Sequence, residues 1–387
     1  MQYRPFGKLD FRVSALGFGC MRLPTVAGGQ IDEPEAIRML RYAIDQGVNY
    51  LDSGYGYHGG ESERLIGKAL QGGYREKVRI ATKLPCQLVT EYADCDRLLN
   101  EQLERLQTNH IDFYLLHGLR KPRWEFVRDL GVVEWLESAR ADGRIGYLGF
   151  SFHDSPEVLK QIITYYEGWD FCQIQYNYMD EETPTQAGTE GLQYAAAKGL
   201  GVVVMEPLLG GYLAAPPKAI QAIWEKAEVK RTAAEWGLQW VWDHPEVSVV
   251  LSGMTTMQQV VENVASAARS GPHQLTPAEL ALVAEVRDQY NKSRPIPCTQ
   301  CGYCMPCPNG IDVPTSFGIF NRGVTYDSLD RARVSYGRVE PGRRASACIE
   351  CGECEAKCPQ SIPIRDWLPI VHQVLGEGAS YDPSRRP

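Results

Sequence analysis

Eight of the twelve cysteines of this 387-residue chain lie in two short runs near its C-terminus, and a proline follows each run. The second run has the spacing C-x-x-C-x-x-C-x-x-x-C-P, and the first run is one residue shorter before its last cysteine. Thiolates spaced by three residues can bind one face of a cubane iron–sulfur cluster, a carrier of single electrons. The sequence therefore predicts two [4Fe–4S] clusters, with the ligands Cys298, Cys301, Cys304, Cys307, Cys348, Cys351, Cys354 and Cys358.

The spacing also assigns these thiolates to two sets, because the last cysteine of each run binds the other cluster in two-cluster ferredoxins. Structural zinc sites use C-x-x-C pairs as well, but zinc explains neither the third evenly spaced cysteine nor the proline. Disulfides need an oxidising compartment, and the opening MQYRPFGKLD lacks the apolar segment of a secretory signal, so a cytoplasmic location is expected. The expected sets are Cys298, Cys301 and Cys304 with Cys358, and Cys348, Cys351 and Cys354 with Cys307, the cysteine that follows the shortened gap.

A second group of residues could carry out acid–base chemistry. Asp52, Lys83 and His117 end three successive apolar segments, and Tyr57 lies in the loop after the first of them. A tyrosine with a pKa near 10 is a poor acid unless a nearby cation stabilises its phenolate, and Lys83 is expected to be that cation. Asp52 would orient Lys83, and His117 would donate a second hydrogen bond to a substrate oxygen. Tyr57 would then protonate the alkoxide that forms when a carbonyl accepts a hydride.

The elements that must position these residues form a repeating pattern. Eight strand-like runs alternate with segments of helical periodicity, which predicts an α/β protein with a (β/α)8 TIM barrel. Such barrels place their chemistry at the C-terminal ends of the strands, and residues 3–13 are expected to form a hairpin plug. An open doubly wound sheet is disfavoured because no G-x-G-x-x-G follows the first strand. The expected strands are residues 14–21, 48–55, 78–84, 111–117, 145–152, 171–178, 201–207 and 247–253.

Length and charge limit the remaining possibilities. The length favours a barrel domain at 1–285 and a smaller domain at 286–387, separated by a helix that Pro295 and Pro297 end. The smaller domain is expected to be a mainly helical, ferredoxin-like iron–sulfur domain. A formal net charge of −8 argues against a nucleic-acid partner. No continuous apolar run is long enough to span a membrane, so no membrane partner is expected.

The barrel motifs also resemble those of a known family. LDSGYGYHGGESERLIGKAL, ATKLP, IDFYLLHG, GRIGYLGFS and SGMTTMQQVVENV are similar to aldo-keto reductase motifs in order and spacing, over residues 1–270. With its cysteine-rich tail, the chain resembles the iron–sulfur subgroup of that family. The resemblance implies an oxidoreductase that acts on a small-molecule carbonyl or alcohol, with Asp52, Tyr57, Lys83 and His117 as the catalytic tetrad.

The resemblance further implies a nicotinamide dinucleotide, NADP(H) or NAD(H), at the barrel mouth. Three positions depart from the family pattern: Phe152 replaces an asparagine, Met205 replaces a stacking tyrosine, and Thr255-Thr256 replace a phosphate-binding arginine or lysine. The matching cofactor positions are Gly19, Cys20, Met21, Ser151, Gln173, Glu206, Pro207, Leu208, Ser252, Gly253, Thr255, Gln259, Glu262 and Asn263.

Electron counting leaves alternatives open. Nicotinamide exchanges two electrons as a hydride, whereas a [4Fe–4S] cluster passes one electron, and a flavin commonly mediates between them. FMN in place of nicotinamide, in a flavin-dependent reductase supplied with electrons by ferredoxin or another electron-transfer protein, is therefore a second hypothesis. A nucleotide-binding redox sensor or electron-transfer module that turns over no carbonyl is a third.

Overall fold

The computed structural model describes residues 1–181, 183 and 185–387. The chain forms two compact units, one made of Met1–Ala214 with Ala234–Leu280 and the other of Ala215–Ala233 with Ala281–Pro387. The domain limits expected from the sequence, 1–285 and 286–387, stay a prediction.

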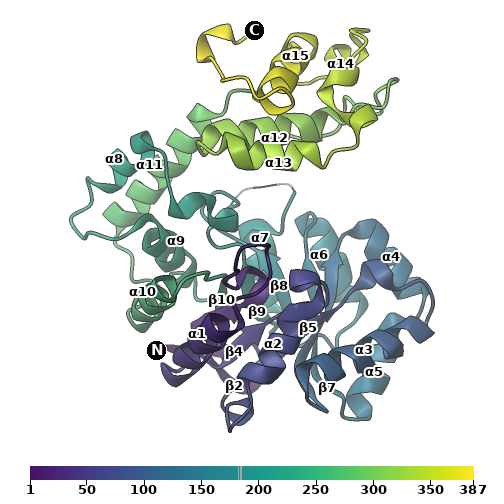
Figure 1. The fold of residues 1–387 in the computed structure, drawn as a ribbon, viewed down its shortest axis with the longest axis vertical. Coiled ribbons are helices and arrows are strands. Elements are labelled where there is room, and N and C mark those ends of the chain that lie inside the picture. The colour runs from purple at the N-terminus through teal and green to yellow at the C-terminus, as the bar shows by residue number, and fades with distance from the viewer. Residues whose placement is uncertain (182, 184) are drawn as a thin grey trace. The chain divides into compact units, whose positions relative to one another are not determined.

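The first unit is built around a closed barrel of eight parallel strands in the order β10-β3-β4-β5-β6-β7-β8-β9, which confirms the expected TIM barrel (Figure 1). Each strand is almost entirely buried, as expected for a parallel sheet covered on its outer face by helices. The strands are β3 (Leu16–Gly19), β4 (Tyr50–Asp52), β5 (Arg79–Leu84), β6 (Ile111–Leu119), β7 (Ile145–Phe152), β8 (Phe171–Gln175), β9 (Gly201–Met205) and β10 (Val249–Ser252).

Helices surround this barrel, and the first of them shows why they form. In α1 (Glu33–Asp45) the buried Ala36, Met39 and Leu40 share one face, and the side chain of Asp32 caps the helix by accepting from the Glu35 amide. The other helices are α2 (Glu61–Ala69), α3 (Ala93–Leu106), α4 (Lys121–Asp129), α5 (Val132–Ala141), α6 (Pro156–Tyr165), α7 (Gly188–Ala197), α9 (Ala233–Trp242) and α10 (Met257–Ala268).

The expected hairpin plug consists of β1 (Tyr3–Phe6) and β2 (Leu9–Ser14), which pair antiparallel. The Phe6 ring is completely buried and lies 4.9 Å from the Phe113 ring of β6, between ring centroids. Gly7 has φ +54°, and a Cβ there would lie 2.3 Å from the backbone nitrogen of Gly201. Only glycine therefore lets the hairpin turn approach β9 so closely.

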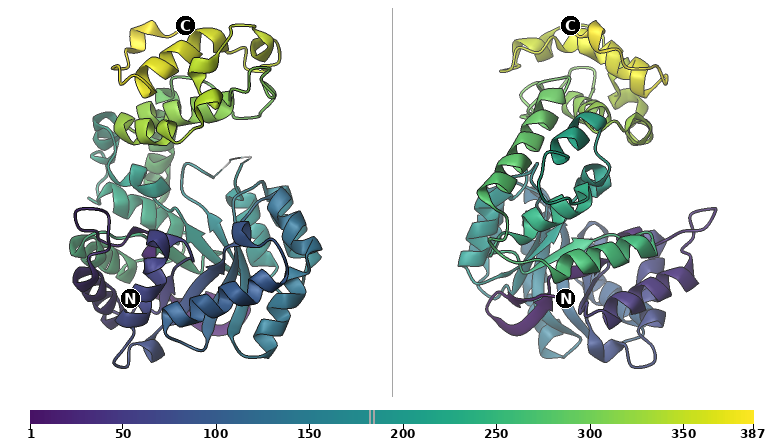
Figure 2. Two further views of the ribbon diagram at one scale, coloured as in Figure 1. Left: turned by 45° about the vertical axis from the view of Figure 1, so that its right-hand side comes forward. Right: turned by 90° about the vertical axis from the view of Figure 1, so that its left-hand side faces the viewer.

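The second unit is helical and has its own apolar core, which includes Phe317, Phe320 and Trp367. Six of the eight cysteines in the two runs pack against this core. The helices α12, α13 and α15 contact one another (Figure 2). None of the helices in the described part of the chain has the length and apolar character needed to cross a membrane. The helices of this unit are α8 (Lys218–Trp224), most of α11 (Pro277–Ser293), α12 (Val313–Thr325), α13 (Leu329–Gly337), α14 (Glu353–Ala356) and α15 (Ile364–Leu375).

Candidate functional site

The structure brings the four predicted acid–base residues together from neighbouring strands. Asp52 is the last residue of β4, Lys83 lies near the end of β5, and His117 lies near the end of β6. Tyr57 begins a short 3-10 segment, Tyr57–Gly60, in the loop after β4. Since β4, β5 and β6 are adjacent in the barrel, their C-terminal ends place these side chains at one edge.

Asp52 and Lys83 form a buried ion pair. Lys83 Nζ lies 2.7 Å from Asp52 Oδ1 and 2.8 Å from Oδ2, and it also donates to the carbonyl of Ser53. Only 1% of the Lys83 side chain and 4% of the Asp52 side chain are exposed. Burial by itself would lower the pKa of Lys83, but Asp52 and Tyr57 raise it above its ordinary value. The ammonium is therefore held charged and fixed in position.

Tyr57 lies next to this ion pair. Lys83 Nζ is 5.0 Å from the centroid of the Tyr57 ring, and the Tyr57 and His117 rings are 6.0 Å apart, between centroids. Burial raises the pKa of Tyr57, and Lys83 offsets this only in part. The sequence led us to expect that Lys83 would favour the phenolate, and its charge acts in that direction, but burial prevails. Tyr57 thus keeps its proton at neutral pH, as a proton donor must.

His117 is neutral and faces a pocket. Burial, with a smaller contribution from the charge of Lys83, lowers the pKa of His117 to about 3. Its Nδ1 atom is buried, and no residue that the structure describes is a hydrogen-bond partner for it. A substrate in the pocket would therefore meet an imidazole that carries no charge. This pocket, of about 420 Å³, is lined by Gln87, His117, Gly118, Arg120, Pro122, Arg123 and Phe126.

A buried polar network behind Lys83 was not anticipated from the sequence. The Glu63 carboxylate accepts hydrogen bonds of 2.6 Å from both Thr82 and Gln102. Gln102 also donates to the Lys83 carbonyl (3.1 Å) and accepts from the Tyr114 hydroxyl (2.7 Å). The network holds the backbone of β5 at the residue that carries the ammonium. The one signal in the sequence is that Glu63 and Gln102 occupy positions on the apolar faces of their helices.

Two of the predicted cofactor residues offer polar groups on neighbouring strands of the barrel. Ser151 of β7 and Gln173 of β8 are register partners and are buried. Gln173 Oε1 has no hydrogen-bond partner among the described residues, and Ser151 Oγ accepts from the Gly118 amide at 2.7 Å. The Ser151 hydroxyl proton remains available. One acceptor and one donor side by side fit a carboxamide, the polar group of a nicotinamide ring.

Other predicted cofactor positions lie after β3 and β9. Gly19 ends β3 and Cys20 begins the 3-10 segment Cys20–Arg22, where burial raises the pKa of the Cys20 thiol. Met21 is 53% exposed. Glu206, immediately after β9, has φ +55°, and the Asn177 side chain donates to its carbonyl at 3.1 Å. The two residues that follow are Pro207, which is buried, and Leu208, which is partly exposed.

The last predicted positions lie between β10 and the first turns of α10. Asn263 donates to the buried Ser252 hydroxyl at 3.0 Å. The Gln259 side chain accepts from the Thr255 amide at 2.8 Å, and Gly253 and Thr255 are exposed. Glu262 is exposed and accepts from Gln258 at 2.7 Å. This loop leads into a helix N-terminus, an environment that suits a phosphate.

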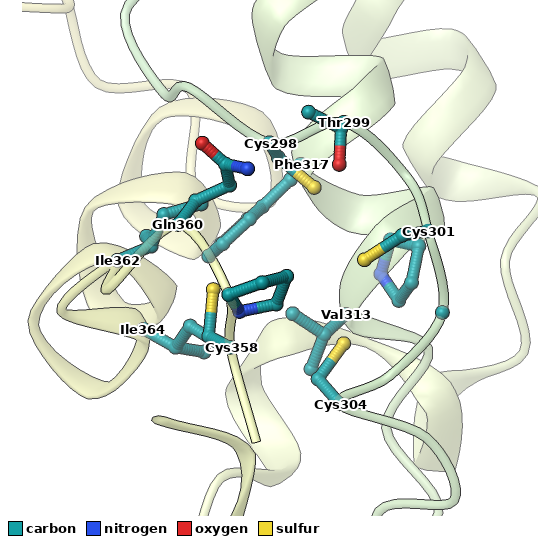
Figure 3. A pocket seen from close by; sticks show the side chains of 13 residues that line it. Cys298, Thr299, Cys301, Cys304, Val313, Phe317, Cys358, Gln360, Ile362 and Ile364 are labelled. Carbon is teal, nitrogen blue, oxygen red and sulfur yellow. The ribbon is translucent and has the colours of Figure 1, made fainter. Parts of the chain in front are cut away.

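In the second unit, cysteines from both runs line one cavity. Figure 3 shows the sulfur atoms of Cys298, Cys301, Cys304 and Cys358 around it. These are the first run's leading three cysteines and the second run's last, the combination expected for one cluster. Apolar side chains form the rest of the wall, including Val313, Phe317, Ile362 and Ile364.

The two runs also have the same local backbone. Gln300 and Glu350 both have positive φ (58° and 55°), and each donates its amide to the sulfur of the cysteine two residues earlier, at 3.4 Å. Gly302 and Gly352 then follow with φ +78° and +79°. Amides directed at sulfur stabilise a thiolate, and this is one way in which proteins tune iron–sulfur clusters. Each run therefore begins with the same turn, which directs an amide at the sulfur of its first cysteine, Cys298 or Cys348.

Comparisons with known proteins agree with both parts of the chain. Residues 15–288 match the aldo/keto reductase family model, and residues 297–362 match that of the 4Fe-4S dicluster domain. The uncharacterized oxidoreductase YrpG of Bacillus subtilis is 31% identical over 236 residues, which cover 55% of this chain and 68% of YrpG. L-galactose dehydrogenase of Arabidopsis thaliana is 27% identical over 289 residues, which cover 69% of this chain and 88% of that enzyme.

Solved structures share the barrel. An aldo-keto reductase of Bacillus halodurans in its holo form is 29% identical with a TM-score of 0.62, over 74% of this chain and 96% of that chain. An aldo-keto reductase of Klebsiella pneumoniae in complex with NADPH is 24% identical with a TM-score of 0.61, over the same shares of the two chains. At that identity, the second likeness shows a common fold.

Proposed function

The chain belongs to the aldo/keto reductase family and carries a C-terminal 4Fe-4S dicluster domain, and we propose that it interconverts a small carbonyl compound and its alcohol, with Tyr57 as the proton donor. The observation that carries this proposal is the ion pair of Asp52 and Lys83, which holds a buried ammonium 5.0 Å from the Tyr57 ring. Burial of a charged ammonium costs free energy. We therefore take its presence beside Tyr57 as support for a functional role of Lys83.

The tetrad residues have separate tasks in carbonyl reduction. The Tyr57 hydroxyl donates a hydrogen bond to the carbonyl oxygen and gives up its proton as negative charge develops there. Lys83 stabilises the phenolate that remains, and Asp52 keeps the ammonium in place. The neutral His117 polarises the same oxygen without competing as an acid, because its pKa is about 3. In alcohol oxidation the same groups act in reverse.

A nicotinamide dinucleotide bound at the mouth would supply or accept the hydride. Its carboxamide would be held by Ser151 and Gln173, which together offer a hydroxyl proton and the free Oε1 atom. The loop before α10 would receive the adenosine side. Hydroxyls at Thr255 and Thr256 bind a phosphate more weakly than a guanidinium does, so NADP(H) and NAD(H) are both proposed and need to be compared directly.

The dicluster domain is proposed to hold two [4Fe–4S] clusters and to exchange electrons with a ferredoxin or a similar carrier. Each cluster would pass one electron at a time. One cluster would be held by Cys298, Cys301, Cys304 and Cys358, whose sulfur atoms line a common cavity. The other cluster would be held by Cys348, Cys351, Cys354 and Cys307.

The test is an anaerobic preparation of the whole protein, analysed for iron, sulfide and flavin and assayed with uncharged aldehydes and NADPH or NADH. We expect about eight iron atoms per chain, no flavin, and aldehyde-dependent oxidation of one nicotinamide. Stoichiometric FMN would favour the flavin-dependent reductase instead. Tight binding of a nicotinamide without turnover of any carbonyl would favour the redox sensor.

A further inference from the structure

The pocket beside His117 joins three segments of the barrel's C-terminal edge. Gln87 belongs to the 3-10 segment Cys86–Leu88 after β5, and His117 and Gly118 belong to β6. The remaining residues are Arg120, which directly precedes α4, and three residues of α4 itself. The pocket has a volume of about 420 Å³, which is within the range of small-molecule sites. His117, a proposed catalytic residue, forms part of the pocket wall. We therefore expect a substrate bound at His117 and Tyr57 to place another of its groups in this pocket.

Two arginines give this pocket its charge. Arg120 and Arg123 line it, and no Asp or Glu among the described residues does so. The carboxylates of α4 are occupied elsewhere, because Glu125 pairs with Lys121 and Asp129 pairs with Arg128. Within the part of the chain that the structure describes, neither pocket arginine forms an ion pair.

The guanidinium of Arg123 is held in place by the protein, whereas Arg120 is exposed. Arg123 Nη1 donates to the Cys86 carbonyl at 3.2 Å, and its guanidinium carbon lies 5.4 Å from the centroid of the Phe126 ring. Arg120 precedes α4 and Arg123 lies in its first turn, where the helix dipole adds positive potential. Nearby, burial with a smaller contribution from Arg120 lowers the pKa of His153 to about 4, so that imidazole remains neutral.

Resting on the proposed carbonyl chemistry at Tyr57, we propose that Arg120 and Arg123 form a subsite for an oxyanion of the substrate. The substrate is then an aldehyde or ketone that carries a carboxylate or a phosphate at its far end. Guanidinium groups recognise both oxyanions through paired N–H donors. The Gln87 amide lies in the same wall and can donate to the oxyanion.

The test compares matched substrates on the cluster-loaded enzyme. Para-carboxybenzaldehyde is paired with its methyl ester, and glyceraldehyde phosphate is paired with glyceraldehyde. We expect kcat/KM to be higher for one charged member than for its neutral partner. A charge-assisted hydrogen bond contributes about 10- to 100-fold, so Arg120→Gln should lower kcat/KM for that charged substrate by this factor. The neutral partner should be unaffected, and the pair with the larger ratio identifies the oxyanion.

Three variants separate the effect of charge from an effect on folding. Arg123→Lys keeps a positive charge and should retain part of the preference, whereas Arg123→Gln should lose it. Arg128→Gln removes an arginine from the same helix that pairs with Asp129 and does not line the pocket, so it should leave the ratio unchanged. Ratios near one for both pairs in the wild type, or ratios unchanged in Arg120→Gln, would overturn the subsite.

A binding measurement keeps the subsite separate from the proposed reaction. Terephthalate carries the same carboxylate as para-carboxybenzaldehyde and needs no turnover. If the enzyme reduces no aldehyde, the proposed function fails, and calorimetry with terephthalate and with glycerol phosphate still decides the subsite. Binding of either anion that weakens at least about tenfold in Arg120→Gln supports it. No binding of either anion to the wild type overturns it.

Discussion

Replacing Lys83 by methionine removes the charge beside Tyr57 and leaves a side chain of similar length. Lys83 Nζ lies 5.0 Å from the centroid of the Tyr57 ring. If this distance stands for the separation of the two charges, Coulomb's law with an effective dielectric constant of about 20 gives about 3 kcal/mol. Lys83 stabilises the phenolate by that amount when Tyr57 gives up its proton, so its loss raises the barrier to proton transfer. Since each 1.36 kcal/mol is a factor of ten in rate, we expect kcat/KM for an uncharged aldehyde to fall about 100-fold or more.

The same variant leaves Asp52 without its partner. Both side chains are nearly inaccessible, at 1% and 4% exposure, and breaking a buried ion pair costs about 3–5 kcal/mol of unfolding free energy. The double variant Asp52→Asn with Lys83→Met removes both charges and should unfold at a higher temperature than Lys83→Met alone. Circular dichroism during heating follows both proteins, so a loss of activity can be separated from a loss of folding.

The decisive assay is a double-mutant cycle with Tyr57→Phe, measured as kcat/KM at neutral pH. If Lys83 acts through the tyrosine, adding Lys83→Met to Tyr57→Phe costs little further activity. Lys77→Met is the matched control, since Lys77 is an exposed lysine that pairs with Asp45. Additive losses in a correctly folded double variant, or full turnover in Lys83→Met, would refute the reasoning.

Three further outcomes follow from the structure. Cys358→Ser should lose about half of the iron, and it should lose the same cluster as Cys298→Ser, because the two cysteines line one cavity. Loss of the same cluster as in Cys348→Ser would contradict the crossed ligand sets, and Cys307→Ser should lose the other half of the iron. Because the pKa of His117 falls to about 3 on folding, only the unfolded chain gains a proton on that ring as the pH drops below about 6.5. The free energy of unfolding therefore decreases as the pH is lowered, by up to about 2 kcal/mol at pH 5. Thermal melts of His117→Gln should show a smaller decrease over the same pH range. The Glu350 amide donates to the Cys348 sulfur and its side chain adds a negative charge there, whereas Gln300 occupies the matching place in the first run. Glu350→Gln should therefore raise the reduction potential of one cluster by about 10–40 mV in an EPR-monitored titration. A lower potential would contradict this.

The barrel and the grouping of the four acid–base residues were predictable because their signals are local. Alternating apolar runs identify the strands, and Asp52 and Lys83 stand out as charged residues at the ends of such runs. The cysteine spacing in the same way led us to group Cys358 with the first run, beside which the structure places it. Each of these features depends on residues that are close in sequence or on a regular repeat.

What escaped prediction depends on burial or on contacts between distant segments. Burial outweighs the effect of Lys83 on the pKa of Tyr57, and no sequence pattern gives the size of that effect. The helix α4 was not anticipated, since Pro122 at its start resembles a turn and only Trp124 and Val127 are buried in it. Without a predicted helix at this point, the sequence gives no reason to expect Arg120 and Arg123 to line a common pocket.

The central claim is that Tyr57 donates the proton to a carbonyl, and Tyr57→Phe tests it most directly. The ring remains and only the hydroxyl is lost, and general acid catalysis contributes about 10²- to 10⁴-fold. We expect kcat/KM for an uncharged aldehyde to fall by that factor in the cluster-loaded enzyme, while iron content and the dissociation constant for the nicotinamide stay at wild-type values. Wild-type turnover by Tyr57→Phe would contradict the account.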